Sequence, residues 1–418
     1  MKIISKKTLK NLYGTNPGRL DEQKKRYHNL AERFKKAFGE KDVWFFSTPG
    51  RSEIGGNHTD HNHGRVLAAA IHLDSIAIAA PVGEKVITVI SEGYKERFEI
   101  DLTDLEPKKE EERTTFALLR GIAARFKALG YEIGGYCAAI SSDVLPGSGL
   151  SSSASIEVLL ATIFNALYND NRITDEELAV IGQYAENVYF NKPSGLMDQM
   201  TCAVGGIVTI DFKDPQKPIV KKVNFDFNNS RYKLVVVDTG GNHADLTDDY
   251  AAVPQEMRAV AAELGGKTCR DIDLDTLLDH VKMLRSKAGD RAILRAFHFL
   301  QDNARVIEQV NALGKNDFDG FLELVRASGN SSFKWLQNIY TSKNVHEQGV
   351  SLALALTEEY LETIGKGACR VHGGGFAGTI QVFLPEPDVD AYKRRMHQVF
   401  DSNSVLVLDI RPHGTLAL

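Results

Sequence analysis

The sequence predicts an α+β protein of two lobes. Segments with the periodicity of helices and of strands follow one another without the regular alternation of a doubly wound sheet, which favours an α+β architecture. With 418 residues, the chain exceeds the size at which one hydrophobic core keeps growing, so we expect two domains. The stretch 213–218 is rich in Pro, Lys and Asp, and it is the predicted boundary between lobes 1–212 and 213–418.

Hydrophobic periodicity predicts the individual elements in order along the chain. A charged amphipathic helix is expected over residues 17–40, and the apolar stretch 44–47 is expected to form a strand. The apolar run 137–140 predicts a short buried strand, and apolar residues recur at helical spacing from 156 to 167. Later in the chain, strands are predicted at 206–212, 232–238 and 379–383, and a long helix at 289–313.

Composition and charge exclude several classes of protein. Hydrophobic residues make up 43% of the chain and charged residues 25%, which are ordinary values for a globular protein with a sizeable core. The net charge of −5 and the lack of a basic run with interleaved aromatics argue against a nucleic-acid partner. No signal-peptide pattern follows Met1, and His72, Asp74 and Ser75 interrupt the apolar stretch 66–82, so we expect a cytoplasmic protein without a membrane partner. The four cysteines form no CxxC pair and are expected to be buried free thiols.

The most informative segment is the run 145–155, Leu-Pro-Gly-Ser-Gly-Leu-Ser-Ser-Ser-Ala-Ser, at the start of a predicted helix. The first backbone N–H groups of a helix have no partner within it and carry the positive end of its dipole, so this run predicts an anion-binding loop. Glycines in the run let phosphate oxygens approach the backbone closely, and serine hydroxyls suit phosphate or Mg²⁺. The simpler interpretation is a serine N-cap that follows a loop. Because the run lacks the lysine of a Walker A motif, another residue must supply a cation.

Three further segments complete a pattern. Residues 48–64 have the sequence Thr-Pro-Gly-Arg-Ser-Glu-Ile-Gly-Gly-Asn-His-Thr-Asp-His-Asn-His-Gly, residues 193–199 have Pro-Ser-Gly-Leu-Met-Asp-Gln, and a glycine-rich turn occupies 371–378. In this order and spacing, the four segments resemble the GHMP kinases, and within them the galactokinase branch, over nearly the whole chain. The first motif of that branch, G-R-x-N-x-I-G-E-H-x-D-Y-x-x-G, aligns with residues 50–64, from which Glu53 and Gly55 depart. Its P-x-G-x-G-L-S-S-S-A motif is met from Gly147 to Ala154 with the proline one place late, and its G-x-M-D-Q element is met at 195–199.

The resemblance implies a two-lobed α+β fold with the active site in the cleft between the lobes. It also implies an ATP-dependent sugar 1-kinase, most simply a galactokinase, which uses ATP and Mg²⁺ and has a small-molecule sugar as its partner. By matching position, the catalytic residues are Asp198, which accepts the proton of the sugar hydroxyl, and Arg51 beside it. The matching ATP-binding residues are Pro146, Gly147, Ser148, Gly149, Leu150, Ser151, Ser152, Ser153 and Ala154, and the Mg²⁺ ligands are Ser153 and Glu186. The matching sugar-binding residues are Asn57, His58, Asp60, Gly195 and Tyr250.

Each of these residues also has a simpler structural interpretation. Aspartate in the first turn of a helix, as expected for Asp198, stabilises the helix whether or not it is catalytic. Arg51 and Glu186 are of types that usually lie at the surface, and a tyrosine such as Tyr250 is often buried for packing alone. The late glycines equally suit a plain turn into a strand.

The sugar-binding motif departs from its relatives at two further positions. Asn57 replaces the glutamate of the branch and His61 replaces its tyrosine. A hydrogen bond to a charged acceptor is worth about 1.5 to 3 kcal/mol and a neutral one about 1, so the change at 57 weakens one hydroxyl contact by roughly 1 kcal/mol. The identity of the sugar therefore stays open, as do a kinase for another alcohol and a non-catalytic sugar sensor. The cluster of His58, Asp60, His61 and His63 also admits a zinc site, if a ligand from elsewhere joins it.

Overall fold

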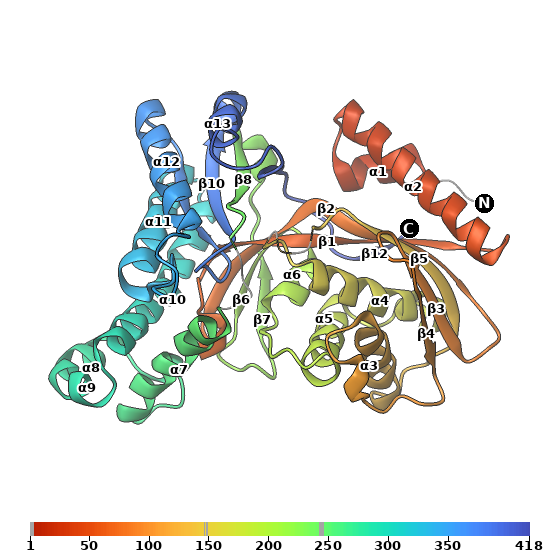
Figure 1. The fold of residues 1–418 in the computed structure, drawn as a ribbon, viewed down its shortest axis with the longest axis horizontal. Helices are drawn as coiled ribbons and strands as arrows, with labels where there is room; N and C mark the ends of the chain where they lie inside the picture. Colours follow the sequence, from red (N-terminus) through yellow and green to blue (C-terminus); the bar gives the residue numbers. More distant parts are fainter. Residues whose placement is uncertain (1–3, 146, 148, 242–245) are drawn as a thin grey trace.

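The computed structural model describes residues 4–145, 147, 149–241 and 246–418, and it has the predicted α+β architecture, with two β-sheets and helices packed against them (Figure 1). The larger sheet consists of β1 (Trp44–Gly55), β2 (Arg65–Pro81), β3 (Val86–Ser91), β4 (Arg97–Asp101), β5 (Tyr136–Ser142), β6 (Ile207–Asp211), β7 (Ile219–Lys222) and β12 (Leu416–Ala417). Its order is β12-β1-β2-β5-β3-β4, with β6 paired to β2 and β7 to β6, and β3 and β5 are parallel. The smaller sheet, in the order β11-β8-β10-β9, consists of β8 (Tyr232–Asp238), β9 (Ala368–His372), β10 (Thr379–Pro385) and β11 (Val405–Leu408).

Helices cover both faces of the larger sheet. Figure 1 shows an N-terminal pair on one face, α1 (Lys6–Tyr13) and α2 (Pro17–Phe38). On the other face lie α3 (Thr115–Ala128), α4 (Ser152–Tyr168), α5 (Asp175–Tyr184) and α6 (Met197–Val204). One apolar cluster joins β2, β3 and β5 to α3 and α4. Another joins Val66 of β2 to Ala154 and Met197, and so holds the starts of α4 and α6 in place.

The smaller sheet is flanked by long helices and joined to a helical extension. Beside it lie α10 (Asp290–Gly314), α11 (Phe318–Ser331), α12 (Gly349–Ile364) and α13 (Val389–Met396), and the extension holds α7 (Thr247–Glu263), α8 (Leu274–Asp279) and α9 (Val281–Lys287) (Figure 1). A second apolar cluster runs between the sheets, from Ile54 and Leu67 of the larger sheet to Leu234 and Phe383 of the smaller one. The two sheets are therefore packed against each other by hydrophobic contact as well as joined by the chain.

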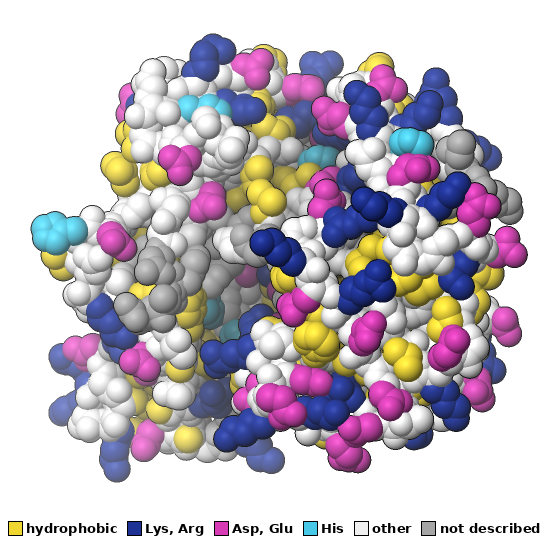
Figure 2. Space-filling view, turned by 45° about the vertical axis from the view of Figure 1, so that its right-hand side comes forward, with side chains coloured by type: hydrophobic (Ala, Val, Ile, Leu, Met, Phe, Trp, Pro, Cys, Tyr) yellow, Lys and Arg dark blue, Asp and Glu magenta, His cyan; other side chains and the backbone are white. Residues whose placement is uncertain are grey.

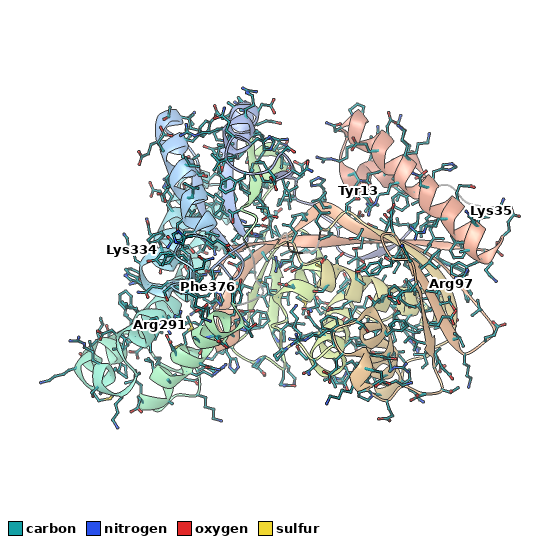
Figure 3. All side chains as sticks on the ribbon, in the orientation of Figure 1. Tyr13, Lys35, Arg97, Arg291, Lys334 and Phe376 are labelled. Atoms are coloured by element: carbon teal, nitrogen blue, oxygen red, sulfur yellow. The ribbon has the colours of Figure 1, made fainter. Side chains whose placement is uncertain are left out.

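A buried charge cluster joins the N-terminal helices to the larger sheet. Tyr13, labelled in Figure 3, donates from its hydroxyl to Oδ2 of Asp74 on β2 at 2.6 Å. Arg26 of α2 and Arg411 near the C-terminus donate to the same carboxylate at 2.6 and 3.0 Å. Because Asp74 is fully buried, its charge requires these partners, and the cluster fixes α1 and α2 on the sheet.

Most predicted elements are confirmed, and one is longer than predicted. The helix expected at 17–40 is α2, the strand at 232–238 is β8, and the long helix at 289–313 is α10. The strand expected at 44–47 continues to Gly55, through a polar stretch that nevertheless is buried because both sheets enclose it. Strands β7 and β12 follow residue 212 but pair with the larger sheet, and the division into lobes 1–212 and 213–418 stays a prediction.

Two expectations about the chain's environment bear on the described residues. The four cysteines are buried free thiols, as predicted. Among the helices that the structure describes, none has the length and apolar character needed to cross a bilayer.

Candidate active site

The run 145–155, which the sequence predicts to be an anion-binding loop, leads into α4. Ser151 immediately precedes the helix with φ of 60°, and its side chain makes no hydrogen bond that caps the helix. Ser151 is thus the N-cap residue by position, but its side chain does not cap the first N–H groups of α4. Gly147 and Gly149 both lie in the left-handed region, with φ of 78° and 71°. Pro146 and Ser148 lie outside the described residues.

Arg51 and Asp198 form a two-bond ion pair at the end of this loop. The Arg51 Nε and Nη2 atoms donate to Oδ1 and Oδ2 of Asp198, each at 2.7 Å. The third guanidinium nitrogen, Nη1, donates to the Gly149 carbonyl at 2.6 Å, and the Ser151 hydroxyl donates to Oδ2 of Asp198. Arg51 and Asp198 are 147 positions apart in the chain, and through Arg51 the run 145–155 is joined to the first turn of α6.

This pairing determines the charge of the Asp198 carboxyl. Burial by itself raises the pKa of Asp198, but the charge and hydrogen bonds of Arg51 outweigh burial, and the pKa lies below its usual value. The Asp198 side chain remains 31% exposed, so solvent reaches part of it. Asp198 is therefore ionised at neutral pH, and it is a weakly basic acceptor that is held in one orientation.

Ser153 and Glu186, the predicted metal ligands, lie together. The Ser153 hydroxyl is 3.4 Å from Oε1 of Glu186, which sits in a π-helical turn after α5. The same carboxylate accepts from the ammonium group of Lys192 at 2.6 Å and from Nε2 of Gln199 at 2.9 Å. A hydroxyl and a carboxylate are hard oxygen ligands that suit Mg²⁺, and the Lys192 ammonium shows that a cation fits beside Glu186. Lys192 has a role that the sequence analysis missed, although it lies only six residues after Glu186.

A second buried acid lies behind this pair. Glu157 of α4 is fully buried, and Gln199 Nε2 donates to it at 2.9 Å as well as to Glu186. Burial raises the pKa of Glu157 well above its usual value, and the nearby charge of Glu186 raises it further. Burial and the neighbouring carboxylate of Glu186 thus both favour the neutral form of Glu157.

Three predicted sugar-binding residues donate to three consecutive carbonyls of the late glycine-rich turn. Asn57 Nδ2 donates to the Gly373 carbonyl at 2.7 Å and His58 Nε2 to the Gly374 carbonyl at 2.9 Å. The Tyr250 hydroxyl donates to the Gly375 carbonyl at 2.8 Å, and burial raises the pKa of Tyr250 to about 12, so the hydroxyl stays protonated. The late turn is therefore attached to the sugar-type motif. The bonds from Asn57 and His58 each join residues more than 300 positions apart in the chain.

Asp60 also lies against Gly195, which comes three residues before Asp198 in the sequence. A Cβ atom placed on Gly195 would lie 2.3 Å from Oδ2 of Asp60, so the absence of a side chain at 195 makes room for that carboxylate. Asp60 therefore lies against the turn that precedes α6 and Asp198.

Asn57 differs from the expectation that its amide faces a sugar. Its side chain is fully buried, and Nδ2 donates to Glu53 as well as to the late turn. Its Oδ1 atom accepts from the Ser332 hydroxyl at 3.2 Å and from Nδ2 of Asn338 at 2.8 Å. An amide with two donors and two acceptor lone pairs has no position left after these four bonds. Asn57 thus attaches the end of β1 to Gly373, Ser332 and Asn338. A contact between its amide and a sugar requires one of these bonds to break.

The histidine-rich loop does not gather metal ligands. Among the residues that the structure describes, no three His, Cys, Asp or Glu side chains converge in a way that would hold a metal ion. Burial, with the neighbouring His61, lowers the pKa of His58 to about 4, so its ring is neutral at pH 7. Its Nδ1 atom is buried without a partner, which leaves one acceptor in this loop for a ligand hydroxyl.

The smaller sheet contributes residues that the sequence analysis did not predict. His372 of β9 contacts the Ser52 hydroxyl and the Thr379 hydroxyl at 3.1 and 2.9 Å, and a Cβ atom on Gly149 would lie 3.0 Å from its ring. Burial lowers the pKa of His372 to about 3, so it is neutral in the folded protein. His372 lies in the predicted turn 371–378, but its contacts with Ser52 and Gly149 join segments far apart in the chain, so no local pattern predicts them.

The surface is hollowed between the two halves of the molecule, and histidine side chains are visible inside the hollow in Figure 2. A cavity of about 750 Å³ lies at the late glycine-rich turn, lined among others by Phe376, Ala377 and Leu246. Phe376, labelled in Figure 3 between the smaller sheet and α7, packs edge-on against the Tyr250 ring with 5.4 Å between centroids. Tyr250 is therefore held by packing as well as by its hydrogen bond.

Comparison with known proteins agrees with this geometry. The sequence matches the GHMP kinases N terminal domain over residues 117–206 and the galactokinase galactose-binding signature over residues 32–81. A galactokinase of Streptomyces coelicolor strain A3(2) is 28% identical over 380 residues, which are 89% of this chain and 92% of that protein. The chain thus contains a GHMP kinase N-terminal domain and a galactokinase galactose-binding signature, and over most of its length it is similar to galactokinases. It is a galactokinase-like phosphotransferase.

Solved structures show the same relationship. The Lactococcus lactis galactokinase complexed with galactose matches this chain with a TM-score of 0.78 and 25% identity, over 94% of this chain and 100% of that one. The Methanococcus jannaschii mevalonate kinase has the same fold, with a TM-score of 0.62 and 16% identity over 89% of this chain and 99% of its own. The two-lobed GHMP kinase fold predicted from the sequence is therefore confirmed.

Proposed function

We propose that this protein is an ATP-dependent galactokinase, which transfers the γ-phosphoryl group of ATP to the anomeric hydroxyl of galactose. The observation that carries the proposal is the cluster of Arg51, Asp198 and Ser151, which joins the anion-binding loop to the first turn of α6. Gly195, three residues before Asp198, adjoins Asp60 of the sugar-type motif. A phosphate-binding element and a hydroxyl-binding element thus share one ionised carboxylate.

Asp198 and Arg51 have complementary roles in this proposal. Asp198 accepts a hydrogen bond from the sugar hydroxyl and so orients its oxygen toward the phosphorus, and it receives the proton as the new bond forms. Arg51 keeps Asp198 ionised and contributes positive charge beside the loop that would hold the phosphates. Because the pKa of Asp198 is low, orientation contributes more than basicity.

Ser153 and Glu186 would hold Mg²⁺, which supplies charge neutralisation on the phosphates when it is bound. The Lys192 ammonium group contacts Glu186 at 2.6 Å, and its side chain is 54% exposed, so it has room to turn aside. Lys192 then remains near the phosphates as the cation that the loop itself lacks. The ATP-binding residues remain those of the run 146–154.

His58, Asp60, Gly195 and Tyr250 would line the sugar site. His58 and Tyr250 already donate to the late turn, so the turn determines where their rings lie. Asn57 holds the loop in this proposal and does not contact the sugar, because its amide is saturated within the protein. This observation favours a second candidate, a related anomeric sugar kinase whose substrate has a different pattern of hydroxyls.

A substrate panel tests the proposal. Purified protein is incubated with MgATP and galactose, its epimers and other hexoses, and ADP release is measured by a coupled assay while ³¹P NMR identifies the phosphorylated position. We expect turnover with galactose and a sugar 1-phosphate as the product. Turnover with another hexose alone would support the second candidate, and absence of turnover across the panel would contradict both.

A further inference from the structure

Glu53 is one of four residues at which the first motif departs from its relatives, and it lies in contact with a second of them, Asn57. The motif of the branch has asparagine at the place of Glu53 and glutamate at the place of Asn57, so the two side-chain types are exchanged in this chain. Asn57 Nδ2 donates to Oε1 of Glu53 at 3.1 Å. The exchange therefore keeps a carboxylate in the loop but moves it four residues toward Arg51.

The strand geometry directs Glu53 toward the same side as Arg51. Both residues lie in β1, where side chains alternate between faces, and the pairing with β2 is regular from Arg51 to Glu53. Because Arg51 faces Asp198, Glu53 extends along the same face, and the charges of Arg51 and Asp60 both act on its carboxyl group. Glu53 thus lies among the residues already assigned to phosphate transfer and to sugar binding.

One oxygen of this carboxylate is held and the other is available. Oε1 accepts from Nη2 of Arg370 at 2.6 Å and from Asn57. In the described part of the chain, no group donates to Oε2, and this atom is not among the buried polar atoms that lack a partner. Since Glu53 retains 5% exposure, its free oxygen faces solvent, whereas the Asn57 amide has none.

We propose that Glu53 is a specificity-determining residue, which accepts a hydrogen bond from one sugar hydroxyl through Oε2 and so replaces the acceptor that position 57 no longer provides. Arg370, from β9, orients the carboxylate by donating to the opposite oxygen and to the Ile54 carbonyl at 2.8 Å. This proposal deepens the proposed function and rests on it. It assigns the choice among sugars to an acid in strand β1 and to its arginine partner in the other sheet.

The test compares galactose with its monodeoxy analogues, or another hexose if the panel selects one. In the wild-type protein, removal of the hydroxyl that Glu53 binds should lower kcat/KM by about tenfold or more. In Glu53→Gln, the KM for the intact sugar should rise about tenfold, and the KM for ATP should stay the same. The loss of kcat/KM on removal of that one hydroxyl, which we call its deoxy penalty, should disappear in this variant. A purely structural role would change stability and overall rate but would leave every deoxy penalty in place, and that result would overturn the proposal.

A second variant covers the case in which Glu53→Gln does not fold. The exchange variant Glu53→Asn/Asn57→Glu restores the order of the branch and keeps one carboxylate and one amide in contact. We expect it to fold and to move the largest deoxy penalty to a different hydroxyl, and an unchanged penalty pattern would refute the assignment. Wild-type protein that phosphorylates no sugar would instead overturn the proposed function, and this inference with it, so the two failures are distinct.

Discussion

Asp198→Asn isolates the contribution of one negative charge, because asparagine has nearly the same shape. The wild-type carboxylate receives two hydrogen bonds from Arg51 at 2.7 Å and one from Ser151. Asparagine retains one acceptor oxygen, so one Arg51 bond persists while the amide group opposes the remaining donors. The substituted side chain thus stays in place but no longer accepts a proton.

The expected effect on turnover follows from this loss. A positioned acid–base group contributes about 10²- to 10⁴-fold, so we expect kcat to fall by that factor. The anion-binding loop keeps its contact with Arg51 through the Gly149 carbonyl, so ATP binding should change little. Loss of charge-assisted bonds costs about 1.5 to 3 kcal/mol, and water reaches the 31% exposed side chain, so we expect the free energy of unfolding to fall by about 1 to 2 kcal/mol.

The assay has three parts and a matched control. ADP release gives kcat, a titration monitored by fluorescence gives ATP affinity, and urea denaturation gives the free energy of unfolding. Glu111→Gln is the control, because Arg120 donates two bonds to Glu111 at 2.7 and 2.6 Å away from the site. It should lose comparable stability and keep its turnover. If Asp198→Asn kept kcat within about threefold of wild type, a range far below the contribution expected of an acid–base group, the proton-acceptor role would be refuted.

Three further predictions concern the loop, the metal and pH. Gly149→Ala should raise the KM for ATP, because a Cβ atom there would lie 2.9 Å from the Thr379 hydroxyl. Gly147→Ala is the control, since Gly147 has a similar φ and open space around it, so the change should cost only backbone strain. Equal KM values for ATP in the two variants would contradict this prediction. Glu186→Gln should raise the Mg²⁺ concentration for half-maximal rate, measured by Mg²⁺ titration, and an unchanged value would remove Glu186 as a ligand. The pKa of His372 is about 3 in the folded protein and about 6.5 in the unfolded chain, so between pH 7 and 5 only the unfolded state gains the proton. The free energy of unfolding of the wild-type protein should therefore fall by about 2 kcal/mol over this range through His372 alone. His372→Asn should lose that dependence in urea denaturation at the two pH values, while His28→Asn, at an exposed site, should keep it.

The sequence by itself determined the features that depend on neighbouring residues. The glycine- and serine-rich run predicts a helix that starts at the serines, because helix periodicity and the dipole at a helix start are local properties, and the structure begins α4 at Ser152. Asp198 was expected in the first turn of a helix, and it lies in the first turn of α6. The ordered motifs also predicted the family and its fold.

Only the tertiary structure decided which of these residues meet and what each one faces. Asn57 matches a sugar-binding position, but its amide is saturated by Glu53, Ser332, Asn338 and the late turn, three of which lie more than 270 residues away. Likewise, the polar stretch of β1 extends as a buried strand because Arg370 and other groups of the smaller sheet satisfy it. Periodicity reports burial of a face, whereas hydrogen-bond partners across two sheets depend on packing between distant segments, which no local pattern encodes.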